Sequence, residues 1–211
     1  MGKSELSPQE AREMFLRVCD RMVASKDLLT QADKAIGDGD HGVGMARGFE
    51  AVRQKIADHA FGTIDDLLKT VGMILMASIG GASGAVFGTF FRGGAKNLGG
   101  KTVFDSAALS LLLADGLQAV QQRGGAKPGD KTMVDALAPA AARASELTTA
   151  PIAESLATVA EAARQGMEET KHMIAAVGKA KPLGERARGH ADPGAVSMYL
   201  ILKSMSEYVG N

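Results

Sequence analysis

The chain has 211 residues, 24 of them basic and 24 acidic, so its formal net charge is zero. This length fits a single domain, residues 1–211, with a sizeable buried core. Because there is no excess of positive charge, we expect neither nucleic acid nor a membrane surface as a partner. The single Cys19 excludes an internal disulfide framework, and no apolar leader stretch follows the first residues. Both features indicate a protein of the reducing cytoplasm.

The spacing of apolar residues predicts helices along the whole chain, separated by glycine-rich turns. Ser7-Pro8-Gln9-Glu10 has the form of a capping box and predicts the start of the first helix. Further helices are expected, in chain order, at 26–35, from near 44, from 63 towards 79, from near 83 to before 99, at 105–122, from 130 or 132, from 152 to about 177, and at 193–209. No alternating run is long enough for a strand. The predicted fold class is all-α, a closed barrel or bundle of about eight antiparallel up-and-down helices.

Residues 70–91 carry no charge, over a length that suits a membrane span. Gly80 and Gly81 interrupt this stretch at its centre, where a lone membrane helix would be weakened. Two buried helices that meet at a glycine-rich turn explain the segment better.

The most informative segment holds three carboxylates, Asp33, Asp38 and Asp40, within eight residues, with glycines on both sides of Asp38. Like charges this close repel one another unless a cation binds between them. Hard oxygen ligands favour Mg²⁺, which completes its shell with water and phosphate oxygens. The alternative is a solvated acidic turn, because Asp and Gly are common in turns. The spacing alone favours neither interpretation.

Three other loops can gather beside these carboxylates at one end of an antiparallel bundle. Residues 80–84 offer bare amides and the Ser83 hydroxyl at a helix start, a natural phosphate seat, although close helix packing also explains the glycines. Residues 124–132 contain Lys127 and Lys131, and residues 184–194 contain Arg186 and His190. Phosphoryl transfer needs positioning and charge neutralisation, which such a set of loops can supply.

Four motifs stand in order over nearly the whole chain: Asp33…Gly37-Asp38-Gly39-Asp40-His41-Gly42…Met45…Arg47-Gly48-Phe49, Gly80-Gly81-Ala82-Ser83-Gly84, Pro128-Gly129-Asp130-Lys131-Thr132-Met133, and Gly184-Glu185-Arg186 with Gly189-His190…Asp192-Pro193-Gly194. Together they resemble the signature of the dihydroxyacetone kinase L subunit. The resemblance implies a nucleotide-binding barrel of eight antiparallel helices, with ADP or ATP and two Mg²⁺ ions at one end.

The resemblance also assigns roles by position. It implies Asp33, Asp38 and Asp40 as the metal ligands and no catalytic nucleophile on this chain. It implies nucleotide contacts from His41, Gly42, Val43, Gly44, Ala82, Ser83, Gly124, Met133, Lys179, Asp192, Pro193 and Gly194. Two positions depart from the family, since Lys179 stands in place of arginine and Gly44 in place of a more usual asparagine. A lysine meets a phosphate as a point charge, without the bidentate fork of arginine.

His41 and the absence of an attached K domain resemble the phosphotransferase-system type of this family. In that type, the resemblance implies, ADP stays bound and is rephosphorylated by a phosphohistidine M subunit. ATP then passes its γ-phosphoryl to dihydroxyacetone, or a related short ketose, on a separate K subunit. Three alternatives stay open: an L subunit that uses free ATP, a stand-alone Mg²⁺-dependent phosphohydrolase with His41 as base, and a non-catalytic helical module. A homodimer also stays open.

Overall fold

The computed structural model describes residues 3–210, and all regular structure within them is helical, which confirms the all-α prediction. The α-helices are α1 (Pro8–Ala24), α2 (Lys26–Ile36), α3 (His41–Ile56), α4 (Ile64–Ser78), α5 (Gly81–Gly94), α6 (Ser106–Gly124), α7 (Val134–Glu146), α8 (Ile152–Glu169) and α9 (Pro193–Gly210). Two 3₁₀ helices, η1 (Thr170–His172) and η2 (Lys181–Ala187), lie between α8 and α9.

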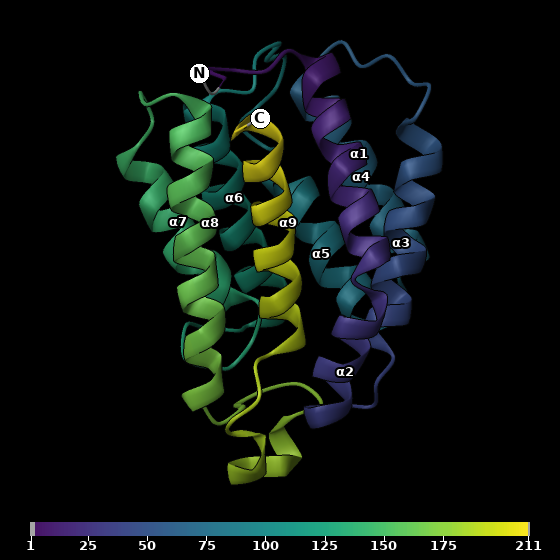
Figure 1. Ribbon diagram of the computed structural model, residues 1–211, viewed down its shortest axis with the longest axis vertical. Coiled ribbons are helices and arrows are strands. Elements are labelled where there is room, and N and C mark those ends of the chain that lie inside the picture. The colour runs from purple at the N-terminus through teal and green to yellow at the C-terminus, as the bar shows by residue number, and fades with distance from the viewer. Residues whose placement is uncertain (1–2, 211) are drawn as a thin grey trace.

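Eight long helices make up the body of the molecule, and the short α2 follows directly on α1 (Figure 1). Each long helix packs against the next one in the chain, from α1 and α3 through to α8 and α9, and α9 packs against α1. The contacts therefore follow the order of a closed ring. Short connections make neighbouring helices alternate in direction.

The ring has two ends that differ in which helices begin there. At the end that we call the closed end, Leu6 before α1 pairs with Phe104 before α6. There the amide of Ile152, the first residue of α8, donates to the carbonyl of Ser4 at 3.0 Å. The helices α1, α4, α6 and α8 begin at the closed end, and α3, α5, α7 and α9 begin at the opposite end, which we call the open end (Figure 1).

The core is built from apolar residues at helical spacing on the inner faces of the helices. On α1 the buried residues include Phe15, Val18 and Cys19, and the Phe15 ring meets the Phe91 ring edge to face at 5.6 Å. Burial raises the pKa of the Cys19 thiol well above its ordinary value. Cys19 is therefore a neutral core residue.

The uncharged stretch 70–91 forms parts of α4 and α5, as the sequence predicts, with the turn at Gly80 and Gly81 between them. The two helices approach closely because glycines face each other: a methyl group at Gly88 would lie 2.7 Å from the carbonyl oxygen of Gly72. In the described part of the chain, no helix combines the length and apolar character that crossing a bilayer requires.

Three helix boundaries differ from the sequence prediction. Helix α3 begins at His41 rather than near residue 44, and α7 begins at Val134, because Lys131 before it takes the left-handed φ of 61°. Helix α8 ends at Glu169, not near residue 177. There the Thr170 hydroxyl donates to the carbonyl of Met167 at 2.6 Å, and the chain turns away into the 3₁₀ helix. Residues 173–192 therefore form a loop at the open end.

Candidate functional site

A cavity of about 730 Å³ lies at the open end of the ring. Its walls come from the first residues of α3, α5 and α9, from residues 131–133 just before α7, from the end of α2, and from the loop 173–192. A cavity of this size is in the range of small-molecule and cofactor sites. Four parallel helix starts around one cavity also bring four partial positive charges to it, which favours an anionic ligand.

The three aspartates of the sequence motif meet at the floor of this cavity. Asp33 is buried near the end of α2, whereas Asp38 and Asp40 are exposed on the turn before α3. Gly39 has a φ of 81°, which glycine adopts without strain, and this conformation lets the turn fold back. One carboxylate oxygen from each aspartate lies within 4.8 Å of the others. This set of hard oxygen donors fits a divalent cation such as Mg²⁺.

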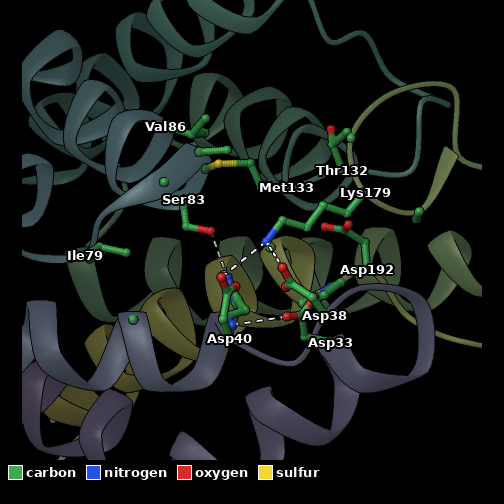
Figure 2. Close-up of a pocket in the computed structure, with 18 of the residues that line it drawn as sticks. Asp33, Asp38, Asp40, Ile79, Ser83, Val86, Thr132, Met133, Lys179 and Asp192 are labelled. Carbon is green, nitrogen blue, oxygen red and sulfur yellow. Dashed lines mark hydrogen bonds and ion pairs between the residues drawn. The ribbon is translucent and has the colours of Figure 1, made fainter.

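The ammonium group of Lys179 contacts two of these carboxylates (Figure 2). Its Nζ lies 2.5 Å from Asp38 Oδ2 and 3.2 Å from Asp40 Oδ2. The hydrogen bond from Lys179 holds the pKa of the Asp38 carboxyl below its usual value, and the same bond raises the pKa of Lys179. The cluster thus favours positive charge at the place where a metal ion would bind, and Lys179 would compete with that ion for the two carboxylates.

The helix starts at the open end differ in how their first amides are paired. The N-cap residues Asp40, Gly80 and Met133 make no side-chain cap of their own within residues 3–210. Other side chains nevertheless accept the first amides of two of these helices, Asp33 that of His41 in α3 and Thr132 that of Val134 in α7, so α5 is the start left without such a partner in the described residues. Gly80 and Gly81 both have positive φ, 78° and 57°, in the turn that leads into α5. Unpaired amides at a helix start bind phosphate groups well.

The start of α9 is capped by its own N-cap carboxylate. The amide of Ala195 donates to Asp192 Oδ2 at 2.8 Å, so Asp192 caps this helix. Burial raises the pKa of the Asp192 carboxyl to about 7. This helix start therefore contributes a weakly charged wall rather than free amides.

His41 lines the cavity and has a hydrogen-bond partner on each side of its ring. Its Nδ1 is 3.0 Å from the Ser83 hydroxyl oxygen, its Nε2 is 2.8 Å from the Ser197 hydroxyl oxygen, and its backbone amide donates to Asp33 Oδ2 at 3.1 Å. Burial lowers the pKa of the imidazole. The ring is therefore a neutral group with a partner at each nitrogen.

The other half of the cavity is apolar. Ile79, Val86, Phe87 and Met133 contribute to its wall. Figure 2 shows Val86 and Met133 on the side of the cavity away from the aspartates, with Ser83 between the two regions. An amphipathic ligand with a flat apolar part and a polyphosphate part matches this division.

Thirteen of the fifteen site residues expected from the resemblance line the cavity. They are Asp33, Asp38, Asp40, His41, Val43, Gly44, Ala82, Ser83, Met133, Lys179, Asp192, Pro193 and Gly194. Gly42 and Gly124 are not among the lining residues. A methyl group at Gly42 would lie 2.2 Å from the carbonyl oxygen of Lys26, so this glycine lets α3 pack on α2, and Gly124 ends α6 in open surroundings.

Three further residues shape the site in ways that sequence reasoning did not predict. Arg47 donates to the carbonyls of Ser78 and Ile79, at 2.7 and 2.5 Å, and so holds the turn before α5. Lys131, expected as an anion contact, is buried, and its ammonium donates to the backbone carbonyls of Thr170 and His190. Ser197 is the third. Arg47 and Lys131 fall inside the motifs, but nothing in the sequence distinguishes Ser197 from a core serine.

Comparisons with known proteins find relatives that match over most of the chain. The sequence model of the DAK2 domain matches residues 35–207. The PEP-dependent dihydroxyacetone kinase, ADP-binding subunit DhaL, of Escherichia coli (strain K12) is 38% identical over 206 residues, covering 95% of this chain and 97% of that protein. The PEP-dependent dihydroxyacetone kinase 1, ADP-binding subunit DhaL, of Listeria innocua is 37% identical over 188 residues, covering 88% of this chain and 89% of that protein.

A solved structure shares the fold. The dihydroxyacetone kinase from C. freundii, in complex with AMP-PNP and Mg²⁺, matches with a TM-score of 0.74 and 25% sequence identity. The match covers 97% of this chain, which spans 35% of the longer C. freundii chain.

Proposed function

This chain belongs to the DAK2 domain family, and from that premise we propose that it is the nucleotide-binding subunit of a phosphoenolpyruvate-dependent ketose kinase. It holds ADP or ATP with Mg²⁺ and passes the γ-phosphoryl group to dihydroxyacetone, or a related short ketose, bound on a separate K subunit. A phosphohistidine M subunit rephosphorylates the ADP. One observation carries the proposal: four helix starts and the three clustered carboxylates face the same cavity.

The polar half of the cavity supplies what a polyphosphate needs. Asp33, Asp38 and Asp40 would hold Mg²⁺, and the resemblance to the family implies two such ions. The bound metal would neutralise phosphate charge. The free amides at the start of α5 and the Ser83 hydroxyl bind phosphate oxygens. The Lys179 ammonium, on a flexible stem, leaves the carboxylates and pairs with a phosphate when a metal takes its place.

The apolar half of the cavity holds the nucleoside. Val86, Phe87 and Met133 surround a space that suits a flat base, while the polyphosphate extends to the aspartates. In this orientation the terminal phosphate lies nearest to Asp38 and Asp40, whose side chains are 53% and 72% exposed. A partner subunit that docks at the open end therefore reaches the phosphoryl group without entering the ring.

The surroundings of His41 favour transfer to a partner over the alternative of a stand-alone phosphohydrolase. A hydrolase would use His41 as a base for water, and such a base needs a free ring nitrogen within reach of that water. Both ring nitrogens of His41 instead lie within hydrogen-bond distance of serine hydroxyls, and the side chain is buried. His41 thus orients a ligand and does not activate water.

Retention of nucleotide by the purified protein tests the proposal first. We expect protein purified without added nucleotide to carry ADP with Mg²⁺, detected by chromatography after denaturation and by metal analysis. Protein without ADP, and without affinity for added Mg²⁺-ADP by calorimetry, would contradict the proposal. The K and M subunits of the E. coli relative then allow phosphoryl flow to be followed.

This reconstitution also separates the alternatives. We expect dihydroxyacetone phosphate to form from phosphoenolpyruvate only when the K and M subunits and the general phosphotransfer proteins are present. Rapid formation from free ATP without the M subunit would identify a subunit of an ATP-dependent split kinase. Sustained phosphate release from ATP by this chain alone would identify a hydrolase. Asp38→Ala with Asp40→Ala should abolish transfer, whereas a non-catalytic helical module would be unaffected.

A further inference from the structure

A hydrogen-bonded chain of three side chains, of which Ser197 and His41 are buried and Ser83 is half-buried, connects α9 to the phosphate seat at the start of α5. Ser197, one turn into α9, is fully buried and lies 2.8 Å from Nε2 of His41. The opposite ring nitrogen, Nδ1, lies 3.0 Å from the hydroxyl oxygen of Ser83. Ser83 faces the cavity, whereas Ser197 is not among the residues that line it. Ser197 therefore affects a ligand only through His41.

A neutral imidazole makes the two ends of this chain depend on each other. One ring nitrogen carries a proton and donates, and the other accepts. A hydroxyl donates one hydrogen bond and accepts others, so the role of Ser197 at Nε2 decides the role that Nδ1 takes towards Ser83. The direction of the Ser83 proton in turn decides whether this hydroxyl donates to a phosphate oxygen. Because Ser197 and His41 are buried, water does not readily replace a missing partner between them.

The same histidine reaches the metal ligands. Its backbone amide donates to Asp33 Oδ2 at 3.1 Å, and Asp33 is the buried carboxylate of the cluster. One residue thus joins the metal-binding carboxylate, the phosphate seat and α9. A change in the orientation of its ring therefore alters the contact between Nδ1 and the Ser83 hydroxyl at the phosphate seat.

We propose that Ser197 is a positioning residue for the nucleotide: through His41 it sets the orientation of the Ser83 hydroxyl towards the phosphates. This inference rests on the proposed function, because it assigns a role in the same site. It adds a residue outside the cavity to the residues that determine nucleotide affinity.

A double-mutant cycle on the whole chain tests the proposal. Calorimetry measures the affinity for Mg²⁺-ADP of the native protein, Ser197→Ala, Ser83→Ala and the double variant. We expect Ser197→Ala to weaken binding by about 3- to 10-fold, as for the loss of one buried hydrogen bond. We expect the double variant to bind like Ser83→Ala alone, because residues in one hydrogen-bond network are not additive. Effects that multiply, or a Ser197→Ala variant with native affinity, would overturn the proposal.

Ser204 provides the matched control. It lies on α9 two turns beyond Ser197, is also buried, and is not a lining residue of the cavity. Ser204→Ala should leave the affinity for Mg²⁺-ADP unchanged, with a melting temperature like that of Ser197→Ala. An equal loss of affinity in both variants would reduce the role of Ser197 to general helix packing and overturn the proposal.

A spectroscopic measurement reports directly on the hydrogen bonds of the His41 ring. In protein labelled with ¹⁵N-histidine, the chemical shifts of the two His41 ring nitrogens report which one carries the proton. At a fixed pH, Ser197→Ala should change the balance of the two tautomers, and Ser204→Ala should not. Unchanged His41 shifts in Ser197→Ala would refute the inference. If the native protein fails to bind Mg²⁺-ADP, the proposed function fails, and these shifts still show whether Ser197 sets the state of His41.

Discussion

At the closed end of the ring, Ser7, Thr63 and Asp105 cap the starts of α1, α4 and α6 with their own side chains. The start of α8 has no side-chain cap within the described residues, but the carbonyls of Lys3 and Ser4 accept its first amides. At the open end, Asp33, Thr132 and Asp192 accept amides at the starts of α3, α7 and α9, and within the same part of the chain only α5 begins without such a side chain. The first amides are therefore paired internally at the closed end, whereas those of α5 at the open end are left to a ligand.

The missing cap lowers the stability of the free protein. A side-chain cap stabilises a helix start by about 1 kcal/mol, so the uncapped start of α5 represents about 1 kcal/mol of stability that the free protein forgoes. The unpaired amides gain their partners when an anion binds. Binding and stability are therefore linked at the open end and independent at the closed end, and each of the following predictions tests that division.

The largest effect is expected at the carboxylate cluster. Asp38→Asn combined with Asp40→Asn should weaken the binding of Mg²⁺-ADP by about 100-fold or more, because two charged metal ligands are lost. Calorimetry with Mg²⁺-ADP measures this loss. Asp66→Asn, in the first turn of α4 at the closed end, is the control and should bind normally. Native affinity in the double variant would break the assignment of the cluster as a metal site.

Removal of the Lys179 ammonium should have two opposite effects. Lys179→Met should weaken the binding of Mg²⁺-ADP by about 10-fold, because a phosphate contact is lost. The same change should strengthen the binding of Mg²⁺ alone by about 2- to 5-fold, since the competing cation is gone from an exposed pair. Titrations with and without ADP measure both. Lys179→Arg should bind ADP at least as tightly as the native protein, owing to its bidentate fork.

A cap removed at the closed end should change stability alone. The Asp105 carboxylate accepts the amide of Ala108 at 2.7 Å, so Asp105→Ala should lower the free energy of unfolding by about 1 kcal/mol. Urea unfolding measures the change. The affinity for Mg²⁺-ADP should stay native, and a clear loss of affinity in this variant would show that the two ends are not independent.

The smallest effect is a pH dependence at the same end. Hydrogen bonds from Lys3 and Ser7 lower the pKa of Glu10 to about 2. A carboxyl whose pKa falls on folding adds stability above its unfolded value of 4.5 and loses it as the pH falls towards 2. Glu10→Gln should therefore cost less than about 1 kcal/mol at pH 6, since the group is partly exposed. The difference between variant and native protein should shrink at pH 3, as measured by unfolding at both pH values.

Local chemistry made the closed end predictable from the sequence. The capping box at Ser7 and the helix start at residue 63, where Thr63 caps α4, depend on residues three apart in the chain, and both predicted starts are confirmed. The carboxylate turn was recognisable for the same reason, because Gly37 and Gly39 stand beside the aspartates that they bring together. Whole helices at regular spacing followed from periodicity alone.

Long-range contacts explain what the sequence did not predict. The apolar pattern of α8 continues past Glu169, but the Lys131 ammonium binds the Thr170 carbonyl and the chain turns there. Lys131 and Thr170 lie 39 residues apart, so no local pattern records their contact. Ser197 is similar, because its partner His41 is 156 residues away.

The closed end also holds both ends of the described chain, since the amide of Lys3 donates to the carbonyl of Val209 at 3.3 Å. A protein engineer can use this proximity. A short linker between these ends would give a circular permutant, opened at a surface turn such as 147–151, that keeps every helix of the ring. A fluorescent domain or an affinity tag fused at either terminus would extend away from the cavity.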